Sequence, residues 1–210
     1  MQTRNGNAVP LVDTEVADIH WNDVIVGLAY GNRFAGHAGT YSIAQHSLIV
    51  AQYMPRGMEF YGLLHDAHEA YIGDVTTPAQ RALSCHADIS QTAQFGFAVD
   101  RAFKNLKATL DRAIYKAAGL EWPIPPEIQA AIKEVDRRVM MTEVRDLMGG
   151  ECAPWDIDAE PYATKIVAWT DPQISVFCFE RSLFNCLSLT ASEMYNMSST
   201  NALHNSTHAN

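Results

Sequence analysis

Residues 61–70, YGLLHDAHEA, place two histidines, one aspartate and one glutamate within five residues of an otherwise apolar, helix-favouring segment. A carboxylate in such surroundings is costly unless it is paired or bound to a metal ion. If the segment is helical, one metal ion can take both His65 and Asp66, and Glu69 shares a face with His65. The alternative is an amphipathic surface helix whose polar face carries these side chains.

The rest of the chain is dominated by apolar residues at helical spacing. We expect helices over residues 21–30, 41–54, 59–73, 99–120, 127–149 and 171–189, with a turn over 73–80. No strand-like alternation competes with these segments. The sequence therefore predicts an all-α fold, with one helical domain over 1–191 and a polar, flexible C-terminal tail over 192–210.

Composition limits the function classes. The chain has 210 residues, of which 48% are hydrophobic and 19% charged, as in a globular domain. A net charge of −9 and a pI near 5.3 exclude nonspecific binding to a nucleic acid polymer, which requires many basic side chains. No apolar run approaches the roughly 18 residues of a membrane span, so we expect no membrane association and a cytoplasmic location.

Two further residues extend the pattern around His65 and Asp66. His46 lies in SIAQHSLIV and Asp136 lies in AIKEVDRRVMM, both within predicted helices. Alone, His46 fits a hydrogen-bonded core histidine, and Asp136 fits a solvated charge. Together with His65 and Asp66 they form an ordered set, His, then His-Asp, then Asp, spread over three predicted helices.

This ordered set resembles the HD-domain metal-dependent phosphohydrolases. The similarity runs from Arg33 through AQHS, LLHDAHEAYIGDVTTP and KEVDRRVMMTEVRDL to WTDP, and so covers most of the chain. Within the family, it is nearest to bacterial 5′-deoxynucleotidases and to short bacteriophage HD proteins, some of which hydrolyse deoxynucleoside triphosphates such as dATP. The resemblance implies a single HD-domain helical bundle and one divalent metal ion bound by His46, His65, Asp66 and Asp136.

The residue types suit this chemistry. Two neutral imidazoles and two carboxylates leave coordination positions open, so Zn, Co or Mn can hold a water and a phosphate oxygen, with Mg considered as a second ion. Glu69 is placed to exchange a proton with the attacking water or the leaving oxygen. His68 is either a hydrogen-bonding partner near the metal ligands or an exposed side chain.

Substrate contacts are expected ahead of the first metal histidine and after Glu69. Arg33 resembles the phosphate- and sugar-binding arginine of the family, with a surface arginine as the alternative. Phe34 stands where the bacterial enzymes carry tryptophan and can pack against a deoxyribose. His37 can contact a phosphate from its loop. Asp74 resembles the acidic residue near the sugar 3′-hydroxyl, with a turn-capping aspartate as the alternative.

Further cations can neutralise a phosphate tail. Arg81 stands near the position where relatives often carry a lysine, and Lys104 and Lys107 lie on the helix expected over 99–120. The alternative for both lysines is a solvated helix face.

We therefore expect a metal-dependent deoxynucleotide phosphohydrolase that converts a deoxynucleoside triphosphate, dATP in the first instance, to a deoxynucleoside and triphosphate. The first alternative is a 5′-deoxynucleoside monophosphatase, and the second is a non-catalytic nucleotide-binding HD module. If the protein is phage-encoded, its location is the host cytoplasm. Formation of a homo-oligomer stays open.

Overall fold

The computed structural model describes residues 1–90, 95–149, 153, 155 and 157–206. Regular structure over these residues is helical, apart from isolated bridges between Gln2 and Ala8 and between Asn32 and Ser42, so the predicted all-α class is confirmed. The helices are α1 (Trp21–Tyr30), α2 (Ile43–Tyr53), α3 (Glu59–Leu64), α4 (Glu69–Ile72), α5 (Thr77–Ser90), α6 (Phe95–Ala117), α7 (Pro126–Leu147) and α8 (Pro172–Ser206). Short 3₁₀ turns lie at Val16–Asp18 (η1) and Phe34–Gly36 (η2).

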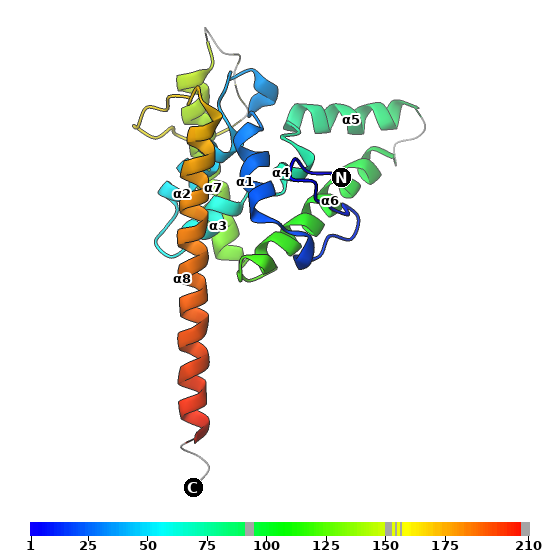
Figure 1. Ribbon diagram of the computed structural model, residues 1–210. Coiled ribbons are helices and arrows are strands. Elements are labelled where there is room, and N and C mark those ends of the chain that lie inside the picture. The colour runs from blue at the N-terminus through cyan, green and yellow to red at the C-terminus, as the bar shows by residue number, and fades with distance from the viewer. Residues whose placement is uncertain (91–94, 150–152, 154, 156, 207–210) are drawn as a thin grey trace.

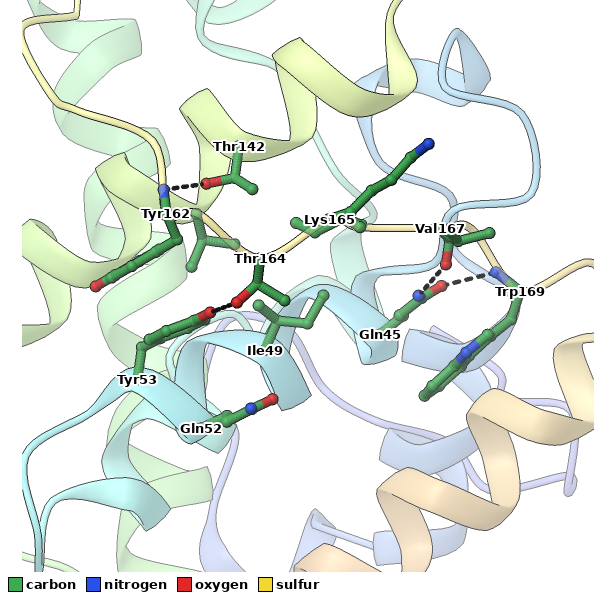
Figure 2. A pocket seen from close by; sticks show the side chains of 12 residues that line it. Gln45, Ile49, Gln52, Tyr53, Thr142, Tyr162, Thr164, Lys165, Val167 and Trp169 are labelled. Carbon is green, nitrogen blue, oxygen red and sulfur yellow. Dashed lines mark hydrogen bonds between the residues drawn. The ribbon is translucent and has the colours of Figure 1, made fainter.

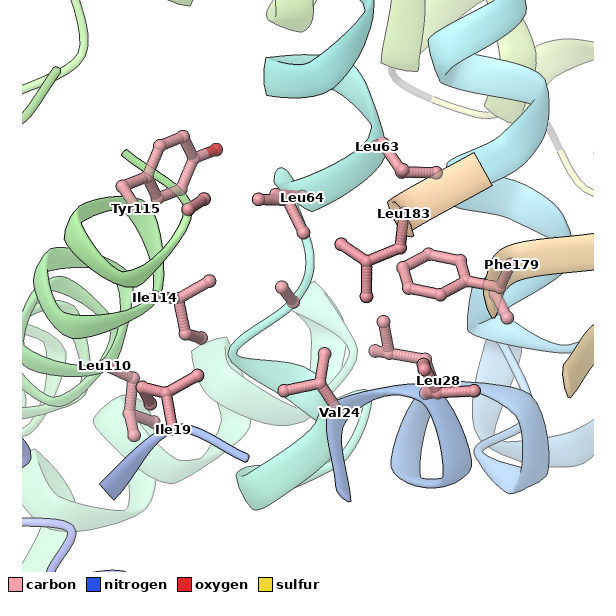
Figure 3. Close-up of a cluster of buried hydrophobic side chains, with 14 of the residues drawn as sticks. Ile19, Val24, Leu28, Leu63, Leu64, Leu110, Ile114, Tyr115, Phe179 and Leu183 are labelled. Carbon is pink, nitrogen blue, oxygen red and sulfur yellow. The ribbon is translucent and has the colours of Figure 1, made fainter. Parts of the chain in front are cut away.

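The main core lies between α1, α3, the second half of α6 and the first half of α8 (Figure 1). In Figure 3, Val24 and Leu28 of α1 face Leu64 of α3, with Ile114 of α6 and Phe179 of α8 on either side. All five side chains are fully buried. Removing this apolar surface from water is the main force that holds the helices together.

A second apolar cluster joins α2 and α7 to the segment over residues 157–171, which lies between the two helices in Figure 2. Its buried members include Val50 of α2, Val139 of α7 and Ile166 of the segment. The first turn of α2 contributes Ile43 to the main core. Because α2 is packed on both sides, His46 between these contacts is fully buried.

The helix predicted over 59–73 is interrupted at residues 65–68, where the sequence expectation is wrong. The backbone N–H groups of Ala67, Glu69 and Ala70 donate to the carbonyls three residues earlier, which is the tighter 3₁₀ pattern. α3 therefore ends at Leu64, and α4 begins at Glu69. His65 and Asp66 lie in the turn between the two helices, not on the face of a continuous helix.

α4 is held in place by a close contact with α1. At Gly27, an added Cβ would lie 2.8 Å from the Cα of Ala70, so only a residue without a side chain allows this approach. The contact fixes α4, and with it Glu69, against the main core.

Two other segments differ from the sequence expectation. The turn expected over 73–80 ends early, because α5 begins at Thr77 with a proline in its first turn, where its missing N–H is not needed. α5 packs on α6, and α5 projects from the bundle together with the first half of α6 (Figure 1). Helical structure in α8 continues to Ser206, beyond the domain end predicted at residue 191.

Candidate metal centre

Four acceptor side chains from three parts of the bundle converge on one point. His46 comes from α2, His65 and Asp66 from the turn between α3 and α4, and Asp136 from α7. The Nε2 atom of His46 lies 3.2 Å from Nε2 of His65, 3.6 Å from Asp66 Oδ2 and 3.2 Å from Asp136 Oδ1. The Nε2 atom of His65 lies 3.2 Å from Asp66 Oδ2 and 3.9 Å from Asp136 Oδ1. The structure thus brings together all four ligands expected from the sequence.

The two imidazoles are oriented by hydrogen bonds on their far sides. Nδ1 of His46 lies 2.6 Å from Glu143 Oε1, and Nδ1 of His65 lies 2.8 Å from the carbonyl oxygen of Gly62. Both partners are acceptors, so each Nδ1 carries a hydrogen. In the neutral rings each Nε2 then presents a lone pair, which is the form that binds a metal ion.

This donor set fits a divalent cation. Ligand atoms at right angles around an ion at about 2.1–2.3 Å lie about 3.0–3.2 Å apart, close to the separations across the cluster. Without a cation, two lone pairs and two carboxylate oxygens repel one another. The cluster is partly exposed to solvent, because the side chains of Asp136 and Asp66 are 31% and 18% exposed, whereas that of His46 is fully buried.

Behind His46, Glu143 of α7 connects the cluster to its surroundings. Glu143 is fully buried, and its Oε1 accepts a hydrogen bond of 2.7 Å from the Tyr41 hydroxyl in addition to the one from His46. Its Oε2 lies 3.3 Å from Nε of Arg33, and Nη1 of the same arginine lies 3.2 Å from Asp66 Oδ2. Arg33 is buried, so the alternative of a surface arginine is wrong.

Sequence reasoning missed both Glu143 and Tyr41. A signal for Glu143 exists in the sequence, because it follows Asp136 by seven residues, two helical turns, and therefore lies on the same face of α7. Tyr41 carries no such signal, since its contact with Glu143 joins positions 102 residues apart.

In the metal-free protein, protons take over part of the charge balance at the histidines. Burial lowers the pKa of His65, but the charges of Asp66 and Asp136 outweigh burial and raise it to about 9. Burial and Arg33 lower the pKa of His46, yet the contacts with Glu143 and Asp136 raise it overall.

The neighbouring carboxylates shift in the opposite direction. Burial raises the pKa of Asp66, but His65, His46 and Arg33 bring it well below the usual range. The pKa of Asp136 is also lowered, because the two histidines outweigh burial. A cation at this position competes with the histidine protons and finds the carboxylates already ionised.

Glu69 and His68 lie beside this cluster and share Asp66 with it. One oxygen each of Asp66 and Glu69 and one ring nitrogen of His68 lie within 4.8 Å of one another. Burial, together with the charges of Asp66 and Asp74, raises the pKa of Glu69 to about 9. His68 is buried, and its Nδ1 lies 2.9 Å from Asp111 Oδ1 of α6, so the alternative of an exposed His68 is wrong.

Phe34, one of the expected substrate residues, follows Arg33 on the same loop, and Asp74, another, contacts this loop from the turn after α4. The backbone N–H of Phe34 donates to Asp74 Oδ2 at 2.8 Å, which ties this loop to the turn after α4. Phe34 has a φ of +56°, a conformation that non-glycine residues adopt rarely. Asp74 thus holds the loop, and Phe34 is half-buried next to the Arg33 guanidinium, 5.4 Å from the ring centre.

The other expected cations differ in whether their charge affects the pKa of Glu69. Lys107 is half-buried, and its charge lowers the pKa of Glu69. Lys104 is 78% exposed and pairs with Asp100 of its own helix. His37 and Arg81 are exposed. Of these four, Lys107 is the one whose charge acts on the centre.

The fold and site together define an all-α protein with a buried centre of two histidines and two aspartates. No family model matches the chain. It is 32% identical over 141 residues to the uncharacterized protein YfdR of Escherichia coli, covering 67% of both chains. It is 28% identical over 155 residues to the uncharacterized protein RCAP_rcc00048 of Rhodobacter capsulatus, covering 69% of this chain and 71% of that one. The chain belongs to the same family as YfdR.

A search of the described helices for membrane spans found none of the length and apolarity that a bilayer crossing requires.

The proton on His65 generates a pH prediction. Its folded pKa of about 9 exceeds the value of about 6.5 in an unfolded chain. The stability that this proton contributes is therefore complete below pH 6.5 and is lost as the pH rises through 9. We expect the melting temperature of the metal-free protein to fall as the pH rises over this range. The rise in melting temperature on addition of Zn²⁺ or Mn²⁺ should become larger over the same range. Thermal unfolding at several pH values, with chelator and with added metal, measures both melting temperatures. A metal-induced rise in melting temperature that does not change with pH would contradict metal binding at His65.

The contacts of Glu143 generate a second prediction. Glu143→Gln keeps the shape of the side chain but removes the charge that faces His46 and Arg33. We expect the affinity for a divalent ion to fall by about 10–100-fold, as measured by competition with a chelating dye. Glu134→Gln, at an exposed position of the same helix, is the matched control and should bind the ion like the parent chain. Equal affinities for the two variants would show that Glu143 does not orient the ligand.

Proposed function

We propose that the protein is a metal-dependent phosphohydrolase that acts on a deoxynucleotide. The observation that carries the proposal is that the Nε2 atoms of His46 and His65 lie 3.2 Å apart, and each lies 3.2–3.9 Å from an oxygen of Asp66 and of Asp136, in a partly exposed cluster. The proposal also draws on the resemblance of the ordered histidine and aspartate residues to the HD phosphohydrolases.

His46, His65, Asp66 and Asp136 would hold the ion. A divalent ion there supplies Lewis acidity to a phosphate oxygen, activates a water and offsets the negative charge that raises the pKa of Glu69. Hydrolysis forms a bond between the water oxygen and phosphorus and breaks the bond from phosphorus to the sugar 5′-oxygen. Glu69 receives a proton from the attacking water and passes it to the leaving 5′-oxygen, so that Glu69 ends the reaction as it began. A buried carboxylate with a raised pKa suits such an exchange near neutral pH.

Arg33 supplies positive charge at the edge of the centre. Its Nε and Nη1 atoms face Glu143 and Asp66, and a guanidinium carries five N–H donors, so others remain for a phosphate oxygen. Since Glu143 also holds His46, one carboxylate sets the position of both the metal ligand and the phosphate-binding arginine.

For the substrate, we propose a deoxynucleoside triphosphate that yields the deoxynucleoside and triphosphate, with dATP as the first compound to test. Phe34, on the loop held by Asp74, offers an apolar surface for a sugar without a 2′-hydroxyl. Lys107 can neutralise part of the phosphate tail. The choice of adenine rests on the resemblance to phage enzymes.

A 5′-deoxynucleoside monophosphatase is the second candidate, since the same bond breaks. It is favoured by the exposure of Lys104 and its pairing with Asp100, which leave Arg33 and Lys107 as expected cations whose charges lower the pKa of Glu69. Fewer cations suit a shorter phosphate chain.

Chromatography of the products formed from the four deoxynucleoside triphosphates and their monophosphates, with Zn²⁺, Co²⁺ or Mn²⁺ added, tests the proposal. We expect deoxyadenosine and intact triphosphate from dATP. Glu69→Gln should bind metal normally and lower turnover by about 10²-fold or more, whereas the exposed Glu127→Gln should match the parent chain.

Three other outcomes separate the alternatives. Hydrolysis of monophosphates with inert triphosphates would establish the second candidate. Nucleotide binding without product would indicate a non-catalytic module. Equal turnover by Glu69→Gln and the parent chain would remove Glu69 from the reaction.

A further inference from the structure

Two buried acceptor atoms beside the metal centre have no hydrogen-bond partner among the described residues: Oε2 of Glu69 and Nε2 of His68. Glu69 is 7% exposed and His68 is 4% exposed. A buried polar atom without a partner costs free energy unless a ligand or water meets it in the working protein. The two atoms belong to consecutive residues at the start of α4.

Asp111 determines which hydrogen-bonding role the free nitrogen of His68 has. Its Oδ1 lies 2.9 Å from Nδ1 of His68 and accepts the hydrogen on that nitrogen. In the neutral ring, Nε2 then carries a lone pair and accepts hydrogen bonds without donating them. Asp111 is half-buried on α6, so a contact between α6 and the turn ahead of α4 fixes the orientation of the ring.

The upper limit on the separation of these groups leaves room for one bridging water molecule. A ring nitrogen of His68 lies within 4.8 Å of a carboxylate oxygen of Glu69, and both lie within the same distance of Asp66. Two acceptors that bind the two hydrogens of one water at about 2.8 Å lie about 4.6 Å apart when the angle at the water is tetrahedral. Asp66 places that water next to the metal centre.

We propose that His68 is a second water-binding catalytic residue and that it holds the attacking water jointly with Glu69. The inference rests on the proposed phosphohydrolase function and names a residue that this function did not require. One hydrogen of the water points to Glu69, which receives it as the oxygen attacks phosphorus. The other points to Nε2 of His68 and stays on the oxygen that becomes part of the phosphate product. His68 thus orients the oxygen lone pair without taking the proton, and Asp111 positions His68.

Turnover by His68→Ala, with metal content and affinity for a non-hydrolysable nucleotide analogue measured in parallel, tests the proposal. We expect about one ion per chain, unchanged analogue affinity and turnover lower by about 10–10²-fold. Added imidazole should restore part of the turnover by occupying the space that the side chain leaves. His86→Ala, an exposed histidine on α5, should behave like the parent chain. If His68→Ala fails to fold, His68→Leu keeps similar bulk without an acceptor and should show the same loss of turnover with unchanged metal content.

A second readout is independent of hydrolysis. Long-range ¹H–¹⁵N spectra report which ring nitrogen carries the hydrogen, and we expect His68 to carry it on Nδ1 in the parent chain. Asp111→Ala should reduce this preference and lower turnover without changing metal content.

The negative outcomes are distinct. A parent chain that hydrolyses no nucleotide would reject the proposed function together with this role. An active parent chain with a fully active His68→Ala variant, or with the hydrogen on Nε2, would reject the role of His68 alone. Loss of metal in His68→Ala would make His68 a metal ligand.

Discussion

The candidate metal centre depends on the mutual repulsion of the acceptor atoms of His46, His65, Asp66 and Asp136, which lie close together in a largely buried cluster. The Nε2 atoms of His46 and His65 lie 3.2 Å from each other and 3.2–3.9 Å from an oxygen of Asp66 and of Asp136, and burial makes each charge costly to leave unbalanced. A cation resolves this repulsion directly. Without one, protons on His65 and His46 do so in part, which is why the pKa values of both histidines are raised. The proposed ligands come from α2, the α3–α4 turn and α7, so one bound ion would join three parts of the bundle.

Around this centre, acidic side chains form hydrogen bonds or ion pairs with the proposed metal ligands and substrate-binding residues and hold them in position. Glu143 contacts both His46, a proposed metal ligand, and Arg33, the proposed phosphate contact, so the proposed ion and the proposed substrate contact share a support. Asp74 holds the loop of Phe34 and adds to the negative charge that raises the pKa of Glu69. Asp111 orients His68. Supports of this kind keep reactive groups in one geometry and reduce the reorganisation needed during the reaction.

The helical class was predictable because it depends on local patterns, and apolar spacing of three and four identified α1 and α7 almost to their ends. His46 and Asp136 were ambiguous on their own. They joined His65 and Asp66 as expected ligands through the resemblance of the ordered set to the HD phosphohydrolases. The 3₁₀ turn at residues 65–68 was not predictable in this way, since its apolar spacing also suits a continuous helix. Asp111 and Tyr41 were missed because their roles arise from contacts over 43 and 102 residues of sequence.

The central claim is that His46, His65, Asp66 and Asp136 bind one divalent ion. It is tested most directly by an anomalous difference map from crystals of the protein loaded with one equivalent of Zn²⁺ or Mn²⁺. The account predicts one dominant peak, about 2.0–2.3 Å from the Nε2 atoms of both histidines and from one oxygen of each aspartate. A map without a peak between these residues, or with its main peak at exposed carboxylates elsewhere, would contradict the account.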